Sequence, residues 1–138
     1  MKAAALALAM ALCASGQKRA DWVQLRGYNY KTGRINADAR SLDRAEVAMV
    51  GYMVPFDDDQ STTVEFLLVP HYGQCIHTPP PPPNQMVLVR MEAGRRARVV
   101  WDKPVSVSGR MFVEEGKGAL GRPLYRMVGT RVDEVTGY

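Results

Sequence analysis

Short apolar stretches alternate with turn-forming residues along most of the chain, which is the pattern of a β protein. In the stretch VSVSGRMFV, Val105, Val107 and Met111 fall on one face and serines on the other, as in a half-buried strand. The stretch EVAMVGYMVPF is apolar on both faces and therefore suits a central strand. The pattern predicts an all-β domain with no long helix after residue 16. Five strands are expected, over residues 46–56, 62–70, 86–92, 105–113 and 124–132.

Two of the expected strands carry a glycine at equivalent places. Residues 47–53 and 105–111 both read V-x-apolar-x-G-x-M, which puts Gly51 and Gly109 inside strands. Glycine inside a strand marks a bulge or a sharp bend at a barrel corner. Five strands with two such bends predict a small, curved, five-stranded barrel of the oligonucleotide/oligosaccharide-binding (OB) type. A β-sandwich would use the same strands and is the alternative.

The first sixteen residues, MKAAALALAMALCASG, have the build of a secretory signal peptide. Lys2 supplies the positive start, residues 3–12 are apolar, and small residues precede the expected cleavage after Ser15 or Gly16. The apolar run is too short to span a bilayer as an anchor. We therefore expect an exported protein whose mature chain has no integral membrane segment.

These boundaries divide the chain into three parts. Residues 1–16 form the signal peptide, residues 17–41 a polar and irregular N-terminal arm, and residues 42–138 a single β-barrel domain. Within the arm, the segment DWVQL (residues 21–25) is the one candidate strand or docking segment.

The net charge of +4 is spread along the chain rather than concentrated. Basic residues run from Lys18 to Arg131, and only Arg95, Arg96 and Arg98 cluster. A nucleic-acid-binding surface needs a denser basic stripe with aromatic residues interleaved. The charge therefore indicates a solvated surface and no nucleic-acid partner.

A cysteine and a histidine precede a run of prolines in the stretch YGQCIHTPPPPPNQ. Cleavage of the signal peptide would remove Cys13 and leave Cys75 as a lone thiol in an oxidising compartment. In extended backbone, Cys75 and His77 would project to the same side. Thiolate and imidazole are preferred ligands of Zn(II) and also suit Cu(I). His71 could close a third ligand position if the segment between the histidines turns back, and the aspartates at 57–59 could supply an oxygen ligand.

Two other interpretations of this pair stay open. Cys75 could be an inert buried side chain, with His77 bonded to loop backbone. A Cys–His nucleophile is disfavoured, because neighbours two residues apart on a strand are poorly placed for proton transfer and no orienting residue is evident. We therefore expect no enzymatic activity.

The prolines at 79–83 predict an extended polyproline II segment. Such a segment could be a ligand for an aromatic groove on a partner. Alternatively it is a rigid strap that fixes the Cys–His loop, with Asn84 and Gln85 tying it to backbone. The strap interpretation is the one we favour.

The segments VGYMVPF, FLLVP and YGQCIHTPPPPPNQMV, in this order and spacing, resemble a family of small secreted bacterial proteins catalogued only as a domain of unknown function. The resemblance covers about residues 42–132, and His71 does not belong to its motif. It implies a periplasmic location in Gram-negative bacteria and a curved β domain. Some relatives are similar in being encoded beside ABC-transporter components in zinc-responsive gene clusters. The matching positions are Gly51, Pro55, Cys75, His77, residues 79–81, Asn84 and Gln85.

Two functions are consistent with these observations. The first is a periplasmic metal-binding or metal-handling accessory protein for zinc or copper, working with an ABC transporter or another envelope protein. The second is a non-enzymatic OB-like binding module for a peptide, a glycan or an envelope protein, with Cys75 and His77 structural. A solvent-reachable Cys75 sulfur that faces His77 would favour the first function, and an enclosed sulfur would favour the second.

Overall fold

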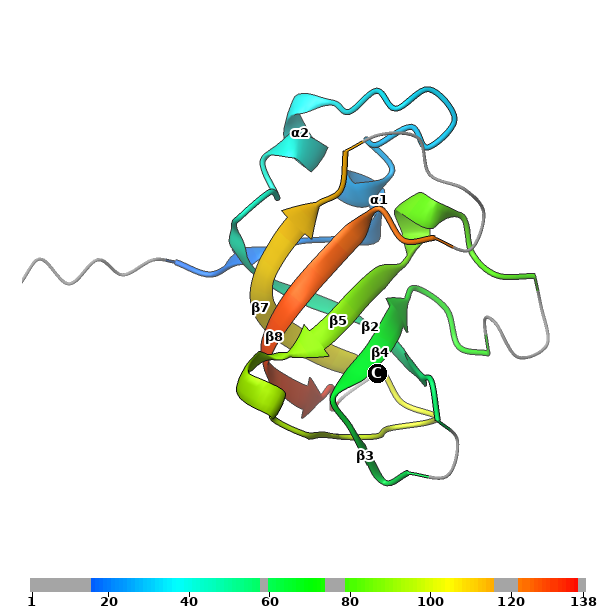
Figure 1. The fold of residues 1–138 in the computed structure, drawn as a ribbon, viewed down its shortest axis with the longest axis vertical. Helices are drawn as coiled ribbons and strands as arrows, with labels where there is room; N and C mark the ends of the chain where they lie inside the picture. Colours follow the sequence, from blue (N-terminus) through cyan, green and yellow to red (C-terminus); the bar gives the residue numbers. More distant parts are fainter. Residues whose placement is uncertain (1–15, 58–59, 74–78, 116–121, 137–138) are drawn as a thin grey trace, which may run out of the picture.

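The computed structural model describes residues 16–57, 60–73, 79–115 and 122–136. Four of the five expected strands are present with small shifts at their ends (Figure 1). The strand expected over residues 62–70 is broken at Val64 into two strands that belong to different sheets. The helices among the described residues have four residues each or belong to short 3-10 turns. The long strands are β2 (Glu46–Pro55), β4 (Glu65–Val69), β5 (Val87–Met91), β7 (Val105–Val113) and β8 (Tyr125–Glu134).

The long strands close into a barrel. Their order is β2-β4-β5-β8-β7, and β7 pairs back onto β2. The β5–β8 pair is parallel, and the other four neighbouring pairs are antiparallel. A β-sandwich would leave two separate sheets, so the β2–β7 pairing excludes that alternative. The OB-like barrel prediction is confirmed.

Gly51 lies where β2 changes neighbours. Residues 46–51 of this strand pair with β7, and residues 52–55 pair with β4. A Cβ atom on Gly51 would lie only 2.7 Å from the carbonyl oxygen of Val69 and 2.9 Å from Cγ of Leu68. The change of partner therefore brings neighbouring backbone so close to β2 that only glycine fits.

Gly109 lies at an irregularity between β7 and β8. The pairing register shifts between Ser108 and Gly109, which is the bulge that the sequence predicts. A Cβ atom at this position would collide with the carbonyl oxygen of Val128. Both glycines of the repeated pattern therefore allow a close backbone approach where the barrel curves.

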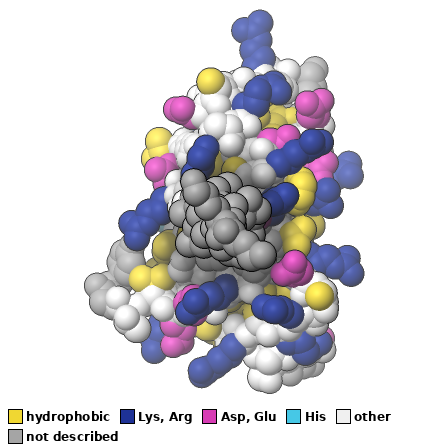
Figure 2. All heavy atoms as spheres, turned by 90° about the vertical axis from the view of Figure 1, so that its left-hand side faces the viewer, with side chains coloured by type: hydrophobic (Ala, Val, Ile, Leu, Met, Phe, Trp, Pro, Cys, Tyr) yellow, Lys and Arg dark blue, Asp and Glu magenta, His cyan; other side chains and the backbone are white. Residues whose placement is uncertain are grey.

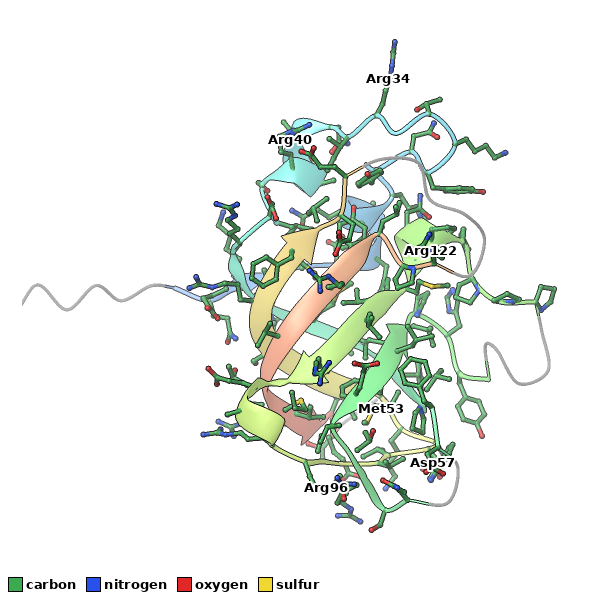
Figure 3. The ribbon with its side chains drawn as sticks, viewed as in Figure 1. Arg34, Arg40, Met53, Asp57, Arg96 and Arg122 are labelled. Atoms are coloured by element: carbon green, nitrogen blue, oxygen red, sulfur yellow. The ribbon has the colours of Figure 1, made fainter. Side chains whose placement is uncertain are left out.

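The core fills the inside of the barrel and extends to one of its ends. Every long strand contributes fully buried apolar side chains, among them Met49, Phe66, Val89, Met111 and Met127. Met53 of β2, labelled in Figure 3, belongs to the same cluster. In β7 the inward positions are those that the alternation of the strand predicts.

The N-terminal arm is more ordered than its composition suggests. It contains β1 (Lys18–Arg19), which pairs in parallel with β2, and two helices, α1 (Trp22–Leu25) and α2 (Ala37–Arg40). Leu25 and Tyr28 are 0% and 2% exposed and join the barrel core. The arm therefore covers one end of the barrel (Figure 1).

Residues 21–25 were expected to be a strand or a docking segment; the strand was wrong, because the segment forms α1, and it docks on the barrel through Leu25. The side chain of Asp21 accepts a hydrogen bond of 2.7 Å from the backbone N–H of Gln24, which is an N-cap interaction. Asn36 caps α2 in the same way through the N–H of Ala39, at 2.9 Å. The capping side chains start helical turns in a segment whose apolar residues alone suggest a strand.

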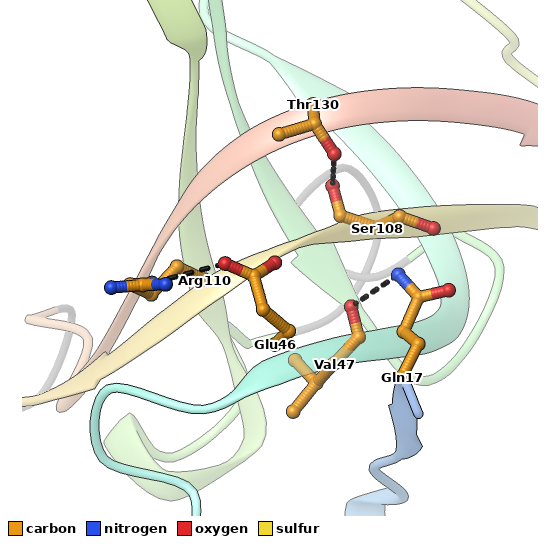
Figure 4. A network of polar contacts seen from close by, with 6 residues as sticks. All are labelled: Gln17, Glu46, Val47, Ser108, Arg110 and Thr130. Carbon is orange, nitrogen blue, oxygen red and sulfur yellow. Dashed lines mark hydrogen bonds and ion pairs between the residues drawn. The ribbon is translucent and has the colours of Figure 1, made fainter. Parts of the chain in front are cut away.

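Short elements and polar contacts complete the fold. The two-stranded sheet of β3 (Thr62–Thr63) and β6 (Ala97–Arg98) lies away from the arm, and η1 (Pro83–Gln85) and η2 (Glu92–Gly94) flank β5 (Figure 1). Among the described residues, no helix has the length and apolar character needed to cross a membrane. Figure 4 shows three contacts beside β2, β7 and β8: Gln17 Nε2 to Val47 O at 3.2 Å, Arg110 Nε to Glu46 Oε1 at 3.0 Å, and Thr130 Oγ1 to Ser108 O at 3.2 Å.

Candidate functional site

The predicted metal site lies mostly outside the described residues. Cys75 and His77 belong to residues 74–78, so their arrangement stays a prediction. His71 is described and lies exposed in the bend after β4. Within the described ranges, no three His, Cys, Asp or Glu side chains gather in a group that could hold a metal ion. Asp57, the described member of the acidic trio, lies at the end of the barrel remote from Arg34 and Arg40 (Figure 3).

The proline segment is extended only up to Pro82. This residue has φ −63° and ψ 159°, which are polyproline II values. The prediction of extended backbone was wrong at Pro83, where η1 begins and the N–H of Gln85 donates a 2.8 Å bond to the carbonyl of Pro82. Proline suits the first position of such a turn, because its missing N–H would have no partner there.

Asn84 and Gln85 fasten the end of the proline segment to the N-terminal arm. The side-chain amide of Asn84 donates a 3.0 Å bond to the carbonyl of Tyr28, and that of Gln85 donates a 3.0 Å bond to the carbonyl of Trp22. Both side chains are buried. The expectation that they tie the segment to backbone is confirmed, and the backbone is that of the arm, more than 50 residues earlier in the chain.

Two buried tyrosines reinforce the junction between arm and barrel. The hydroxyl of Tyr125 donates a 2.8 Å bond to the carbonyl of Leu25, and that of Tyr28 donates a 2.7 Å bond to the carbonyl of Glu114. Their rings meet edge to face with centroids 6.1 Å apart. Burial, and then the neighbouring Tyr28, raise the pKa of Tyr125 above its ordinary value. Tyr125 therefore remains a protonated hydrogen-bond donor at neutral pH and is not poised for acid–base chemistry.

An apolar hollow of about 430 Å³ lies on the outer face of the barrel, across β4, β5, β8 and β7. Leu88, Phe112 and Val128 form its floor. The strand register brings them together, because Leu88 and Phe112 both pair with Arg126, two residues before Val128. These positions alternate with buried ones, so the floor faces outward. We call this site the outer hollow; it is lined by Glu65, Leu88, Arg90, Phe112, Arg126, Met127 and Val128.

The charged residues at the rim of the outer hollow are paired with one another. Nη1 of Arg90 lies 3.8 Å from Oε2 of Glu65, and Arg126 forms an ion pair with Glu114. These side chains remain at least a third exposed, so each pair contributes only about 0–1 kcal/mol to stability. The rim is therefore nearly neutral. Its arginines can exchange their glutamate partners for polar groups of a ligand at a small cost in free energy.

A line of half-buried apolar side chains extends from the outer hollow toward β2. Leu88 pairs with Leu67 of β4, and Leu67 pairs with Val54 of β2. Beside this line, the rings of Tyr52 and Tyr72 lie 5.9 Å apart, and Tyr72 is 65% exposed. Half-buried and exposed apolar side chains therefore run across several strands to the start of the β4–β5 loop.

The basic triplet of the sequence is bound to its neighbours rather than gathered for a ligand. The guanidinium of Arg96 donates to Thr62 Oγ1 at 2.7 Å, to Gln60 Oε1 at 2.8 Å and to the carbonyl of Thr62 at 3.0 Å. Arg95 reaches the carbonyl of Thr130 at 3.4 Å. Figure 2 shows basic side chains interspersed with acidic ones over one face, without a continuous basic stripe.

Comparison with known proteins gives the family of the chain. A family model described as "Protein of unknown function (DUF3299)" matches residues 14–134. The chain belongs to the DUF3299 family. It is similar to a DUF3299 family protein from Pseudomonas aeruginosa PAO1 whose crystal structure is known, with 26% identity and a TM-score of 0.66 over 88% of this chain and 98% of that chain. No curated protein matches the chain.

The family assignment confirms the resemblance found in the sequence, and it brings no established activity. In this DUF3299 protein, the outer hollow is the feature that sequence reasoning missed. Its signal was present, because Leu88 and Val128 alternate with Arg90 and Arg126 at outward positions. The sequence alone does not reveal that β5 pairs with β8 and that β8 pairs with β7. These pairings place the outward residues side by side.

Proposed function

We propose that this DUF3299 protein is a non-enzymatic binding module that holds an extended peptide segment of an envelope protein in the outer hollow. The observation that carries the proposal is the apolar floor of Leu88, Phe112 and Val128 within a rim of arginine and glutamate. A volume of about 430 Å³ lies within the range of ligand sites, about 300–1,000 Å³. OB-type barrels also bind ligands on the face of their second and third strands, here β4 and β5, although that likeness is one of fold alone.

The chemistry of the outer hollow favours a peptide over a glycan. Two of the three floor residues are aliphatic, whereas sugars are held by flat exposed rings and many polar groups. The arginines at the rim can bond to peptide carbonyls or carboxylates, since Arg90 is 77% exposed at its side chain. A peptide cannot add as a new strand here, because β5 and β8 are paired on both of their edges. Recognition is therefore by side chains.

The envelope location rests on the signal-peptide form of residues 1–16 and on the secreted nature of the proteins that the sequence resembles. A transporter component of the envelope is one partner of this kind.

Peptide display on the mature protein tests the proposal. Peptides enriched on the native protein are then measured by fluorescence anisotropy against two variants, Val128→Arg and Val50→Arg. Val50 is a matched control for Val128, because Val128 is 40% exposed in the outer hollow and Val50 is 38% exposed on β2. Val128→Arg should weaken binding by about tenfold or more, because a long charged side chain would fill the apolar floor. Val50→Arg should change it by less than about twofold.

Equal loss in both variants, or no loss in Val128→Arg, would place the peptide elsewhere on the barrel. Failure to enrich any peptide with apolar side chains would exclude the peptide-binding function. A thermal melt of each variant establishes that the fold is intact.

A further inference from the structure

The N-terminal arm and the four residues that join it to β2, together residues 17–45 and called the arm below, carry the excess positive charge of the mature protein. Residues 17–45 contain seven Lys or Arg and three Asp, whereas residues 46–138 contain ten Lys or Arg and eleven Asp or Glu. The arm is thus strongly basic and the barrel is nearly neutral. The basic residues of the arm, which we call the arm cations, are Lys18, Arg19, Arg26, Lys31, Arg34, Arg40 and Arg44.

Four arginines of the barrel form ion pairs with acidic residues, and the arm cations differ from them. All seven are exposed, and none forms an ion pair with any residue in the described part of the chain. Lys31 lies 5.9 Å from the ring centre of Tyr30, which is a cation–π contact and does not neutralise it. On the barrel, by contrast, Arg90, Arg110 and Arg126 each face a glutamate.

Two of the three acidic side chains of the arm accept hydrogen bonds from backbone N–H groups. Asp21 accepts from the N–H of Gln24 at 2.7 Å, and Asp43 accepts from the N–H of Val113 at 3.0 Å. Arg34 and Arg40 project from the end of the molecule that the arm covers (Figure 3). The arm therefore carries a net positive charge, and two of its cations lie at one end of the protein.

The arm holds these charges on a fixed surface and not on a loose tail. Leu25 is fully buried in the core, and its carbonyl accepts the hydroxyl of Tyr125. Asn84 and Gln85 bond to the carbonyls of Tyr28 and Trp22. Val23 on α1 is 69% exposed and adds an apolar contact beside the charges.

We infer that the arm end of this protein binds an anionic phospholipid surface. Lipid headgroups move laterally and can gather beneath scattered cations, so they do not require the matched pairing that a folded partner needs. Each Lys or Arg near such a surface strengthens binding by about fivefold. The hollow beside the arm is no phosphate pocket, because its lining includes Asp43 and Glu115. A membrane surface is also the extended anion that an exported protein meets, whereas nucleic acid is not.

Vesicle co-sedimentation of the mature protein tests the inference. Vesicles of phosphatidylethanolamine with about a quarter phosphatidylglycerol are compared with vesicles of phosphatidylcholine at low salt. The native protein should bind the anionic vesicles and be released as salt is raised above about 0.3 M, where charges are screened. Binding of equal strength to the zwitterionic vesicles would overturn the inference.

Two charge-matched double variants locate the surface. Arg34→Glu with Arg40→Glu should weaken binding to anionic vesicles by about 25-fold or more, because two attractions are lost and two repulsions are added. Arg98→Glu with Arg131→Glu makes the same change in net charge on exposed barrel positions and should weaken it by less than about threefold. Equal losses in the two double variants would show that net charge alone acts, and would overturn the inference.

Two further measurements distinguish a lipid surface from an acidic protein, and the arm from the outer hollow. A soluble poly-glutamate peptide that binds the protein when anionic vesicles do not would identify an acidic protein as the partner and overturn the membrane inference. Val128→Arg should leave vesicle binding unchanged, so loss of peptide binding in the outer hollow and loss of membrane binding at the arm are distinguishable. Loss of vesicle binding in Val128→Arg would contradict the assignment to the arm.

Discussion

The barrel and the N-terminal arm are held in their conformations by different interactions. The barrel strands bond to one another in a closed ladder, and in β7 the pattern of the strand already indicates which side chains lie inside. The helices of the arm have four residues each, and helices so short are unstable in isolation. They persist because their capping side chains start them and the barrel core receives Leu25 and Tyr28.

The two regions also differ in charge. Four arginines of the barrel form ion pairs with acidic residues, whereas none of the arm cations does so among the described residues. This difference suggests a division of work in which the barrel face binds an apolar ligand and the arm contacts an anionic surface. Variants that destabilise one region and leave the other intact test whether the two regions are held by different interactions.

The largest effect should come from breaking the barrel at Gly109. In Gly109→Val the new Cβ would collide with the carbonyl oxygen of Val128, and backbone cannot move aside as a side chain does. We expect a loss of about 4 kcal/mol in the free energy of unfolding. Urea denaturation measures it, with Ser106→Val on the same strand as a control that should change little. A Gly109→Val variant as stable as its control would show that β7 and β8 do not approach as closely as described.

The next effect should come from detaching the arm. Leu25→Ala removes a fully buried side chain through which α1 joins the core, and it should cost about 3 kcal/mol. Val23→Ala, on the same helix but 69% exposed, should cost less than about 0.5 kcal/mol. If both substitutions have the same small effect in thermal and urea unfolding, the arm does not share the core of the barrel.

A smaller effect should follow from loosening the bond between the proline segment and the arm. Asn84→Ala leaves the carbonyl of Tyr28 without its buried donor and should cost about 2 kcal/mol. Gln24→Ala removes a 3.0 Å bond to the carbonyl of Asp38 at the surface and should cost less than about 0.5 kcal/mol. Hydrogen exchange of the arm amides should accelerate in the first variant and not in the second. Unchanged exchange in Asn84→Ala would mean that the bond does not restrain the arm.

The smallest effect should come from metal addition at the loop between β4 and β5. If Cys75 and His77 bind Zn(II) or Cu(I), metal at about ten times its dissociation constant should stabilise the reduced protein by about 1.4 kcal/mol. Binding should weaken as pH falls, because the thiol must lose its proton. Cys75→Ser and His77→Ala should each abolish the effect, and His71→Ala should reduce it less. Calorimetric titration that shows the same affinity in the native protein and in Cys75→Ser would exclude the metal site.

The sequence by itself determined the strands of the barrel and its two close backbone contacts. A strand is a local property, because alternate side chains must be apolar to face a core, as in residues 105–113. Gly51 and Gly109 were identifiable because a glycine inside such a pattern has few other reasons to be there. Membership of an uncharacterised family was also expected from the sequence.

Only the tertiary structure decided where the arm lies and which outward side chains meet in the outer hollow. Asp21 and Asn36 turn polar segments into helices, but their place against the barrel depends on Asn84, Gln85 and Tyr125, far away in sequence. The outer hollow likewise needs the pairing of β5, β8 and β7, since its floor comes from all three strands. Contacts between distant segments depend on how the whole chain folds, and a local pattern of residues does not specify which distant segments pair.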